Sequence, residues 1–398
     1  MSLESRRAAS VTAPSFSALK AASTAYTRKT GGSVIDFSIG SSNIPPSDSL
    51  KQVLADASLD DDVYQYNLGP SAQMLSTIQD WYQERYGCSL AENEIAVLKG
   101  SQEALSHLPL AFLNPEDVLL IPDPHYPIYS TACQIAGCES YGMPLKKENG
   151  YLPDFEAIPA DILERAKMIL ISYPNNPTGA TAPDSFYEEM IAFAKKHSLL
   201  IVHDNAYSEL IFSGKPGRSF LSFEGAKEIG IELNSLSKSY SFGGARFAVM
   251  AGNAEMIAAY TRLMDMMDFG GFGAVGKAAI HALKNEKQFP SQVCQEYRRR
   301  RDYLIDAFGQ AGWNIEPSQG TMFVWAPIPE NWKDSMQFTY DLLDQTGILV
   351  HPGTNFGHEG ERYVRLALVR SDEEVDEAAA RLKSSGFFMP DPGSCPAE

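Results

Sequence analysis

Short apolar runs that alternate with helical stretches constrain the fold of this chain more than any other feature. Five such runs follow one another between residues 94 and 235, at 95–98, 117–121, 167–172, 199–203 and 229–233. A strand that is apolar at nearly every position is buried on both faces, as in a parallel sheet covered by helices. The alternation therefore predicts a largely parallel sheet with helices on both sides.

Each apolar run leads directly into an unusual polar motif. These motifs are Gly100-Ser-Gln-Glu, Pro122-Asp-Pro-His-Tyr126, Tyr173-Pro-Asn-Asn176-Pro-Thr-Gly179, Asp204-Asn-Ala-Tyr207 and Asn234-Ser-Leu-Ser-Lys238. In open α/β sheets, ligands bind at the carboxyl ends of the strands. We therefore expect the five motifs to gather along one edge of the sheet and to form a ligand site there.

The last motif carries a lysine with the neighbours that a phosphate-bearing aldehyde cofactor requires. Ser235 and Ser237 precede Lys238, and Arg246 follows it beyond the glycine pair 243–244. A lysine amine can form a Schiff base with the aldehyde, while hydroxyls and an arginine hold the phosphate. Taken alone, the stretch is equally consistent with a surface loop; the other motifs favour the cofactor site.

The length of 398 residues fits two domains. We expect a large domain at residues 50–290 and a smaller α+β domain made of residues 1–49 and 291–398. The first 33 residues are rich in Ser, Ala and Thr and are expected to be loose, with one short helix. Apolar spacing predicts further helices at 71–86, 185–197, 288–310, 336–344 and 372–383.

Charge and composition exclude several classes of protein. A formal net charge of -17 argues against nucleic-acid and anionic-membrane partners, which require a basic face. The sequence has no 18-residue apolar run and no apolar stretch of a signal peptide at its start. Its five cysteines are scattered and form no C-x-x-C pair, as is usual in a reducing compartment. We expect a soluble cytoplasmic protein.

Three of the motifs, Asn176-Pro-Thr-Gly179, Asp204-Asn-Ala-Tyr207 and Ser235-x-x-Lys238, resemble those of the class I and II aminotransferases of fold type I. The resemblance runs from Gly40 to the carboxyl-terminal helix. Within the family, the chain is most similar to LL-diaminopimelate and aspartate aminotransferase-like proteins. The resemblance implies pyridoxal 5'-phosphate as cofactor and an α/β fold. That fold has a large domain with a mostly parallel seven-stranded sheet between helices, and a smaller α+β domain.

The resemblance also implies a role for each residue around the cofactor ring. Asp204 would face the pyridine nitrogen and keep it protonated, so that the ring can accept electrons. Asn176 and Tyr207 would donate hydrogen bonds to the phenolic oxygen, and Tyr126 would stack on the ring. Lys238 would be the Schiff-base residue and the proton shuttle, and with Asp204 and Tyr207 it forms the implied catalytic set.

The phosphate would be held by residues from two segments. By the same resemblance these are Ser101, Gln102, Ser235, Ser237 and Arg246. The amides of the first two would open a helix, whose amino end attracts an anion. Arg246 would add a charge-assisted bond.

The remaining implied residues bind substrate or join two subunits. Arg365 would bind the substrate carboxylate, because a planar guanidinium matches a carboxylate bidentately. Gly40 would offer a backbone donor close by, and Asn176 would also lie at the substrate. Tyr64 matches a tyrosine that family members lend to the phosphate of the neighbouring subunit, which implies a homodimer with active sites at the interface.

The implied reaction is ping-pong transfer of an amino group between an amino acid and a 2-oxo acid. LL-diaminopimelate and aspartate both stay open as donors. Two alternatives also stay open: a pyridoxal-phosphate lyase or synthase of the same fold, and a non-enzymatic cofactor-binding descendant. The G-x-G-x-x-G match at 271–276 lacks a preceding strand, so it is a weak dinucleotide signal. His351 and His358 lack further ligand spacing, so we expect no metal. His203 should point to the opposite face of its strand from Asp204.

Overall fold

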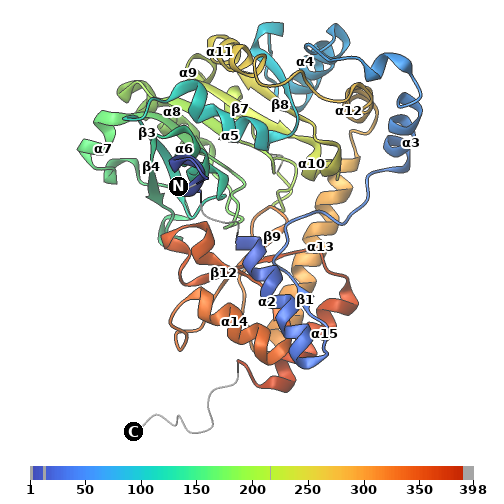
Figure 1. Ribbon diagram of the computed structural model, residues 1–398, viewed down its shortest axis with the longest axis vertical. Helices are drawn as coiled ribbons and strands as arrows, with labels where there is room; N and C mark the ends of the chain where they lie inside the picture. The colour runs from blue at the N-terminus through green and yellow to red at the C-terminus, as the bar shows by residue number, and fades with distance from the viewer. Residues whose placement is uncertain (1–2, 12–14, 216, 389–398) are drawn as a thin grey trace.

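A seven-stranded sheet runs through the upper part of the computed structural model, which describes residues 3–11, 15–215 and 217–388 (Figure 1). In spatial order its strands are β2 (Ile95–Leu98), β8 (Ala248–Gly252), β7 (Gly230–Ser235), β6 (Leu200–Asp204), β5 (Ala166–Ile171), β3 (Val118–Asp123) and β4 (Glu139–Pro144). From β7 to β4 all neighbours are parallel, whereas β8 is antiparallel to both β2 and β7. The predicted, mostly parallel sheet is confirmed.

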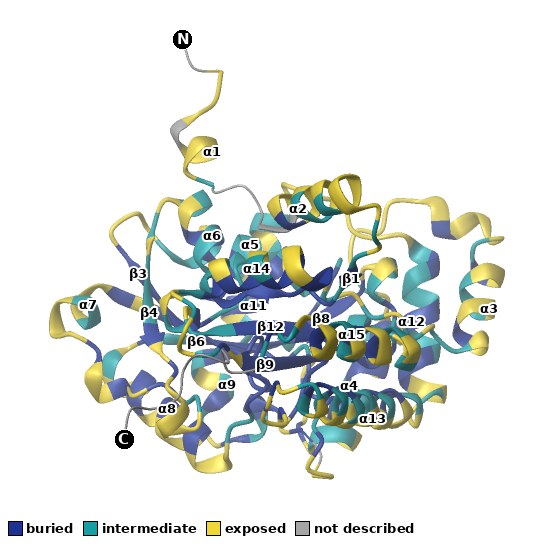
Figure 2. Cartoon of the chain, turned by 90° about the horizontal axis from the view of Figure 1, so that it is seen from below, coloured by how far each residue is buried: buried dark blue, intermediate teal, exposed yellow. Residues whose placement is uncertain are grey.

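Helices cover both faces of this sheet, as the strand pattern predicted (Figure 1). Along β3, Val118 and Leu120 join the apolar core on one face, and Leu119 and Ile121 join the core on the other. Figure 2 shows the result as buried strands inside a rim of exposed helix surface. The covering helices include α3 (Asp48–Ala57), α4 (Ala72–Tyr86), α5 (Ser101–Phe112), α6 (Ile128–Ala136), α7 (Ala160–Arg165), α8 (Asp184–His197), α9 (Ala226–Ile229), α11 (Ala254–Met264) and α12 (Gly273–Asn285).

Local signals explain where these helices begin and end. The Ser71 hydroxyl accepts the Met74 amide and caps α4, and Gly87 ends that helix in the left-handed conformation. The predicted helix at 71–86 is therefore confirmed at both ends. Helices predicted at 185–197 and 288–310 are confirmed as α8 and α13 (Phe289–Gln310).

The lower part of Figure 1 contains a three-stranded antiparallel sheet with helices around it. Its strands are β11 (His351–Pro352), β12 (Tyr363–Ala367) and β9 (Phe323–Pro327), and a two-stranded parallel pair joins β1 (Ile35–Asp36) to β10 (Ile348–Leu349). The helices are α13, α14 (Ser335–Thr346) and α15 (Asp372–Ser385). Because β1 pairs with β10, the start and the end of the chain meet here. The domain boundaries at residues 50 and 290 stay a prediction.

The expectation of a loose start with one short helix is wrong. The described part of that segment forms α1 (Arg6–Ser10) and the longer α2 (Ser15–Thr30). Leu19 of α2 packs with Leu343 and Leu349. Helix α2 is rich in Ser, Ala and Thr and packs on the protein through few apolar side chains. Its apolar residues therefore show only a weak helical periodicity, and the sequence pattern did not reveal the helix.

Within residues 3–11, 15–215 and 217–388, no helix combines the length and the apolar character needed to cross a membrane.

Candidate active site

Lys238 lies on α10 (Leu236–Ser239), immediately after β7. Its Nζ donates a hydrogen bond of 2.9 Å to the carbonyl oxygen of Gly40, which comes from the amino-terminal segment. Burial, together with the nearby positive charges of Arg365 and Arg246, lowers the pKa of Lys238 to about 8. The neutral, nucleophilic amine is therefore far more available near neutral pH than in an ordinary lysine.

Asp204 is the last residue of β6 and is buried. Its Oδ2 accepts a hydrogen bond of 2.7 Å from the hydroxyl of Tyr129, whereas its buried Oδ1 has no partner within the described chain. Burial raises the pKa of this carboxyl above its usual value. Buried polar oxygens normally have a hydrogen-bond partner, so Oδ1 is suited to accept a hydrogen bond from a donor group of a ligand.

Arg365 of β12 lies in a buried setting with aromatic rings on two sides. Its guanidinium carbon is 4.0 Å from the ring centre of Phe323 and 4.6 Å from that of Phe356. One terminal nitrogen donates to Asn176 Oδ1 at 2.9 Å and the other to the Ser38 carbonyl at 3.2 Å. Burial lowers the pKa of Arg365 to about 10. The rings and the two acceptors fix the plane of the guanidinium, which suits it to a carboxylate ligand.

The same site includes the other residues predicted around a cofactor ring. Asn176 follows β5 and reaches Arg365, as described above. Tyr207 is buried against Phe323, with ring centres 6.0 Å apart, and burial raises the pKa of its hydroxyl. Tyr126, after β3, donates its hydroxyl to Gln102 Oε1 at 3.0 Å. Gly40 packs so closely on Phe323 that an added Cβ would lie 2.7 Å from the ring.

The start of α5 and Arg246 form a cradle suited to an anion. Gly100 caps α5 with a φ of 87°, and Ser101 is the first helical residue. A Cβ on Gly100 would overlap the Arg246 guanidinium, so the helix start and this cation touch. Helix amides and a guanidinium in contact suit a phosphate dianion. Ser235 caps α10 and donates to the Ser237 hydroxyl at 2.9 Å.

Tyr64 is the one predicted residue whose contacts lie outside this cluster. Its side chain is 68% exposed, its hydroxyl donates to the Ser58 carbonyl at 2.8 Å, and its ring lies against Phe272. An exposed position is compatible with a residue lent to another subunit, and that role stays a prediction.

Two buried groups escaped the sequence analysis, one at the site and one on the other side of β6. Tyr129, on the first turn of α6, is the hydrogen-bond donor to Asp204, and no spacing in the sequence links these two residues. Glu232 is fully buried in β7, and a charge within the otherwise apolar run 229–233 is itself a signal. Its Oε2 lies 3.1 Å from His203 Nδ1. His203 therefore points away from Asp204, as predicted.

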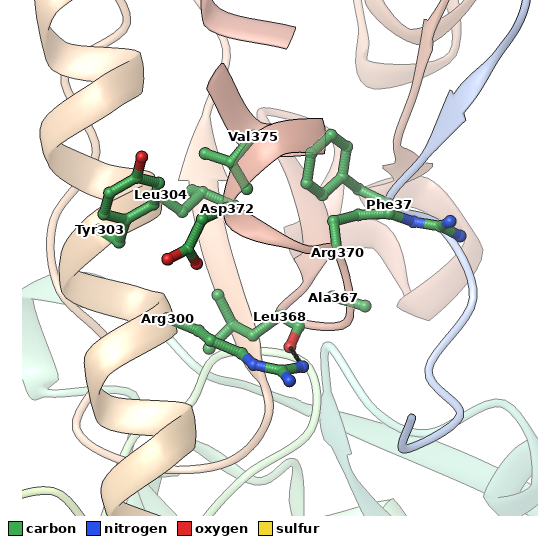
Figure 3. A pocket seen from close by; sticks show the side chains of 9 residues that line it. All are labelled: Phe37, Arg300, Tyr303, Leu304, Ala367, Leu368, Arg370, Asp372 and Val375. Atoms are coloured by element: carbon green, nitrogen blue, oxygen red, sulfur yellow. Dashed lines mark hydrogen bonds between the residues drawn. The ribbon is translucent and has the colours of Figure 1, made fainter. Parts of the chain in front are cut away.

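A small cavity, shown in Figure 3, lies between α13, β12 and α15. Arg300 donates to the Leu368 carbonyl at 3.2 Å beside it. The volume of this cavity is about 10 Å³, which is enough for about one water molecule and too small for an amino acid. Among the residues that the structure describes, no group of three or more His, Cys, Asp or Glu is placed to bind a metal ion.

The family model for aminotransferases of class I and II matches residues 33–382. The LL-diaminopimelate aminotransferase of Dehalococcoides mccartyi is 42% identical over 360 residues, covering 89% of this chain and 92% of the relative. That of Halothermothrix orenii is 40% identical over 366 residues, covering 91% and 93%.

Solved structures agree over nearly the whole chain. Apo BacF from Bacillus subtilis matches with a TM-score of 0.92 at 34% identity, covering 96% of this chain and 98% of BacF. A probable N-succinyldiaminopimelate aminotransferase from Thermus thermophilus matches with a TM-score of 0.86 at 36% identity, covering 93% and 99%.

Proposed function

Because the chain belongs to the class I and II aminotransferases, we propose that it uses pyridoxal 5'-phosphate and takes LL-diaminopimelate as amino donor. As an aminotransferase, it moves an amino group from an amino acid to a 2-oxo acid. One observation supports the cofactor proposal: Asp204 and Lys238 follow one another at the carboxyl ends of the neighbouring strands β6 and β7, and the charges of Arg365 and Arg246 lie close enough to lower the pKa of Lys238. The donor is the one in the names of the relatives at 40–42% identity.

The residues of the site fit this cofactor. The unpartnered Asp204 Oδ1 would accept a hydrogen bond from the protonated ring nitrogen, and the cradle at Gly100 and Arg246 would hold the phosphate. Ser101, Gln102, Ser235 and Ser237 would complete the phosphate site. When bound, the cofactor supplies an aldehyde for the lysine amine and a ring that accepts electrons.

The reacting groups of the chain then have distinct roles. Lys238 would hold the cofactor covalently, and its neutral amine, once free, would move the proton at the substrate's Cα. Asp204 would keep the proton on the ring nitrogen, and Asn176 and Tyr207 would donate hydrogen bonds to the phenolic oxygen. Tyr126 covers the ring face. Burial of the lysine and of the carboxylate excludes water, which strengthens each of these interactions.

A half-reaction tests the proposal. The holoenzyme is mixed with LL-diaminopimelate alone, with no 2-oxo acid present. We expect one equivalent of the donor to convert the cofactor to pyridoxamine 5'-phosphate, followed by return of the original absorbance when 2-oxoglutarate is added. Conversion by aspartate but not by LL-diaminopimelate would reassign the donor. Release of ammonia without pyridoxamine 5'-phosphate would show a lyase.

Arg365→Lys is expected to weaken the binding of both amino acid and oxo acid. Lysine keeps the charge but loses the planar fork that Phe323 and Phe356 hold in place. A loss of about 1.5–3 kcal/mol in binding free energy is expected for one charge-assisted hydrogen bond. Titration of the cofactor absorbance with the amino acid measures it.

Arg362→Lys is the matched control, because Arg362 donates to backbone carbonyls such as those of Trp332 and Pro329. Its substrate affinity should equal that of the parent. If Arg365→Lys binds substrate normally, or loses the cofactor instead, the carboxylate-binding residue lies elsewhere.

We further propose that the chain works as a cytoplasmic homodimer. Exposed apolar side chains gather on two segments that touch through two ring pairs, Tyr64 with Phe272 and Tyr66 with Phe269, each 5.4 Å apart. The rest of the set is Leu68, Met266 and Met267. These segments line a surface cavity of about 1150 Å³ that also exposes Arg246. Apolar patches of this kind usually mark interfaces, and a second subunit here would bring Tyr64 to the partner's phosphate site.

Disrupting this apolar patch should yield a monomer with weakened cofactor binding. In Tyr66→Ser/Phe269→Ser, the aromatic pair is lost and the partner's contribution to the phosphate site is lost with it. Analytical ultracentrifugation should give twice 43.7 kDa for the parent and 43.7 kDa for the variant. Tyr340→Ser, an exposed tyrosine on α14, is the control and should stay dimeric. A parent that sediments as a monomer would rule the dimer out.

A further inference from the structure

Tyr129 is a buried tyrosine whose hydroxyl has a specific partner in the active site. It donates to Asp204 Oδ2 at 2.7 Å, the length of a strong hydrogen bond to a carboxylate. Burial raises the pKa of Tyr129 well above its ordinary value, and the negative charge of Asp204 raises it further. The phenol therefore stays protonated and acts as a donor at all working pH values.

Tyr129 supplies the side-chain hydrogen bond that Asp204 receives within the described chain. His203, the adjacent residue, directs its ring nitrogens to Glu232 at 3.1 Å and to the Tyr173 carbonyl at 3.2 Å. Burial raises the pKa of Asp204, and the bond from Tyr129 is the strongest influence that lowers it again. Tyr129 thus bears on both the orientation and the basicity of this carboxylate.

The geometry leaves the two carboxylate oxygens with different tasks. Oδ2 is occupied by Tyr129, and Oδ1 is buried without a partner. The Tyr129 ring also meets the Tyr126 ring edge to face, with centres 6.0 Å apart at 87°. One residue of α6 therefore contacts both the carboxylate and the aromatic residue assigned to the cofactor ring.

We propose that Tyr129 is a positioning residue that presents Asp204 Oδ1 to the ring nitrogen of the cofactor and keeps the shared proton on that nitrogen. This inference rests on the proposed function. A hydrogen bond to Oδ2 withdraws charge from the carboxylate, so the carboxylate competes less for the proton of its ring-nitrogen partner. Without the bond, the proton shifts toward Asp204, and the ring becomes a poorer electron acceptor.

The test is the ¹⁵N resonance of the ring nitrogen in holoenzyme loaded with ¹⁵N-labelled pyridoxal 5'-phosphate. In Tyr129→Phe the resonance should move toward that of neutral pyridine. The kcat should fall by roughly 10-fold to 100-fold, the range of one charge-assisted hydrogen bond, while KM changes little. A purely structural role would lower stability without moving the resonance.

Tyr173→Phe is the matched control. Tyr173 is equally buried, and its hydroxyl donates at the same 2.7 Å, but to the backbone carbonyl of Tyr151. Its ring-nitrogen resonance should match that of the parent. Should Tyr129→Phe fail to fold, fluorotyrosine at position 129 keeps the shape and strengthens the donor, so the resonance should move toward that of the pyridinium ion.

The outcomes separate this inference from the proposed function. If the parent binds the cofactor with a protonated ring nitrogen and neither change at position 129 moves the resonance, Tyr129 only packs and the inference is wrong. If the parent binds no cofactor, the proposed function itself fails.

Discussion

Lys238→Ala is expected to lose turnover by about 10⁴-fold or more, the largest effect predicted for any single change in this chain. The amine of Lys238 is proposed both to hold the cofactor and to move the proton, and a general base alone typically contributes 10²–10⁴-fold. With its pKa lowered to about 8, this amine is prepared for both tasks. Single-turnover kinetics with LL-diaminopimelate measure the loss.

The fate of the cofactor distinguishes a lost reacting group from a misfolded protein. In Lys238→Ala the cofactor should still occupy the Asp204 and Arg246 contacts, yet leave on gel filtration because no covalent bond holds it. Lys227→Ala is the control, since Lys227 pairs with Glu94 at 2.7 Å and belongs to none of these contacts. A cofactor that stays covalently attached to Lys238→Ala would contradict the assignment.

Asp204→Asn is expected to lower kcat by about 10²-fold to 10³-fold, the cost of removing one preorganised charged contact at a reacting centre. The amide can still accept the Tyr129 hydrogen bond, so the variant should fold and bind cofactor. It cannot hold the ring nitrogen protonated, because it carries no negative charge. Stopped-flow measurement of the half-reaction isolates this chemical step.

Asp117→Asn provides the comparison for Asp204→Asn. Asp117 is also buried, but it precedes β3 and accepts the Asn114 amide at 2.8 Å. Its half-reaction rate should equal that of the parent. A near-normal rate in Asp204→Asn would mean that another residue faces the ring nitrogen.

The parallel part of the sheet could be predicted because each of its inner strands is apolar on both faces. An apolar run does not indicate whether its strand is parallel or antiparallel to its neighbours. The antiparallel placement of β8 was therefore not predicted. The edge strand β4 also escaped the sequence analysis. Its segment Glu-Ser-Tyr-Gly-Met-Pro is half exposed and contains glycine and proline, which mask the strand pattern.

The candidate site could also be predicted only in part, because its contacts join segments that are far apart in the chain. Arg365, in an otherwise apolar strand, required a partner from another segment, and the structure supplies Asn176 and Ser38. Those residues lie 189 and 327 positions away along the chain, and no sequence spacing encodes such pairs. The Tyr129 contact with Asp204 spans 75 positions for the same reason. Residue chemistry indicated that partners exist, and only the fold identifies them.

Borohydride reduction of the holoenzyme, followed by peptide mapping, tests most directly whether this site binds the cofactor. Reduction makes the lysine–cofactor bond permanent, so mass spectrometry can locate it in the chain. The expected result is one modified peptide per chain, carrying the reduced cofactor on Lys238. A modification on any other lysine, or none in an enzyme that still transfers amino groups, would contradict the proposed site.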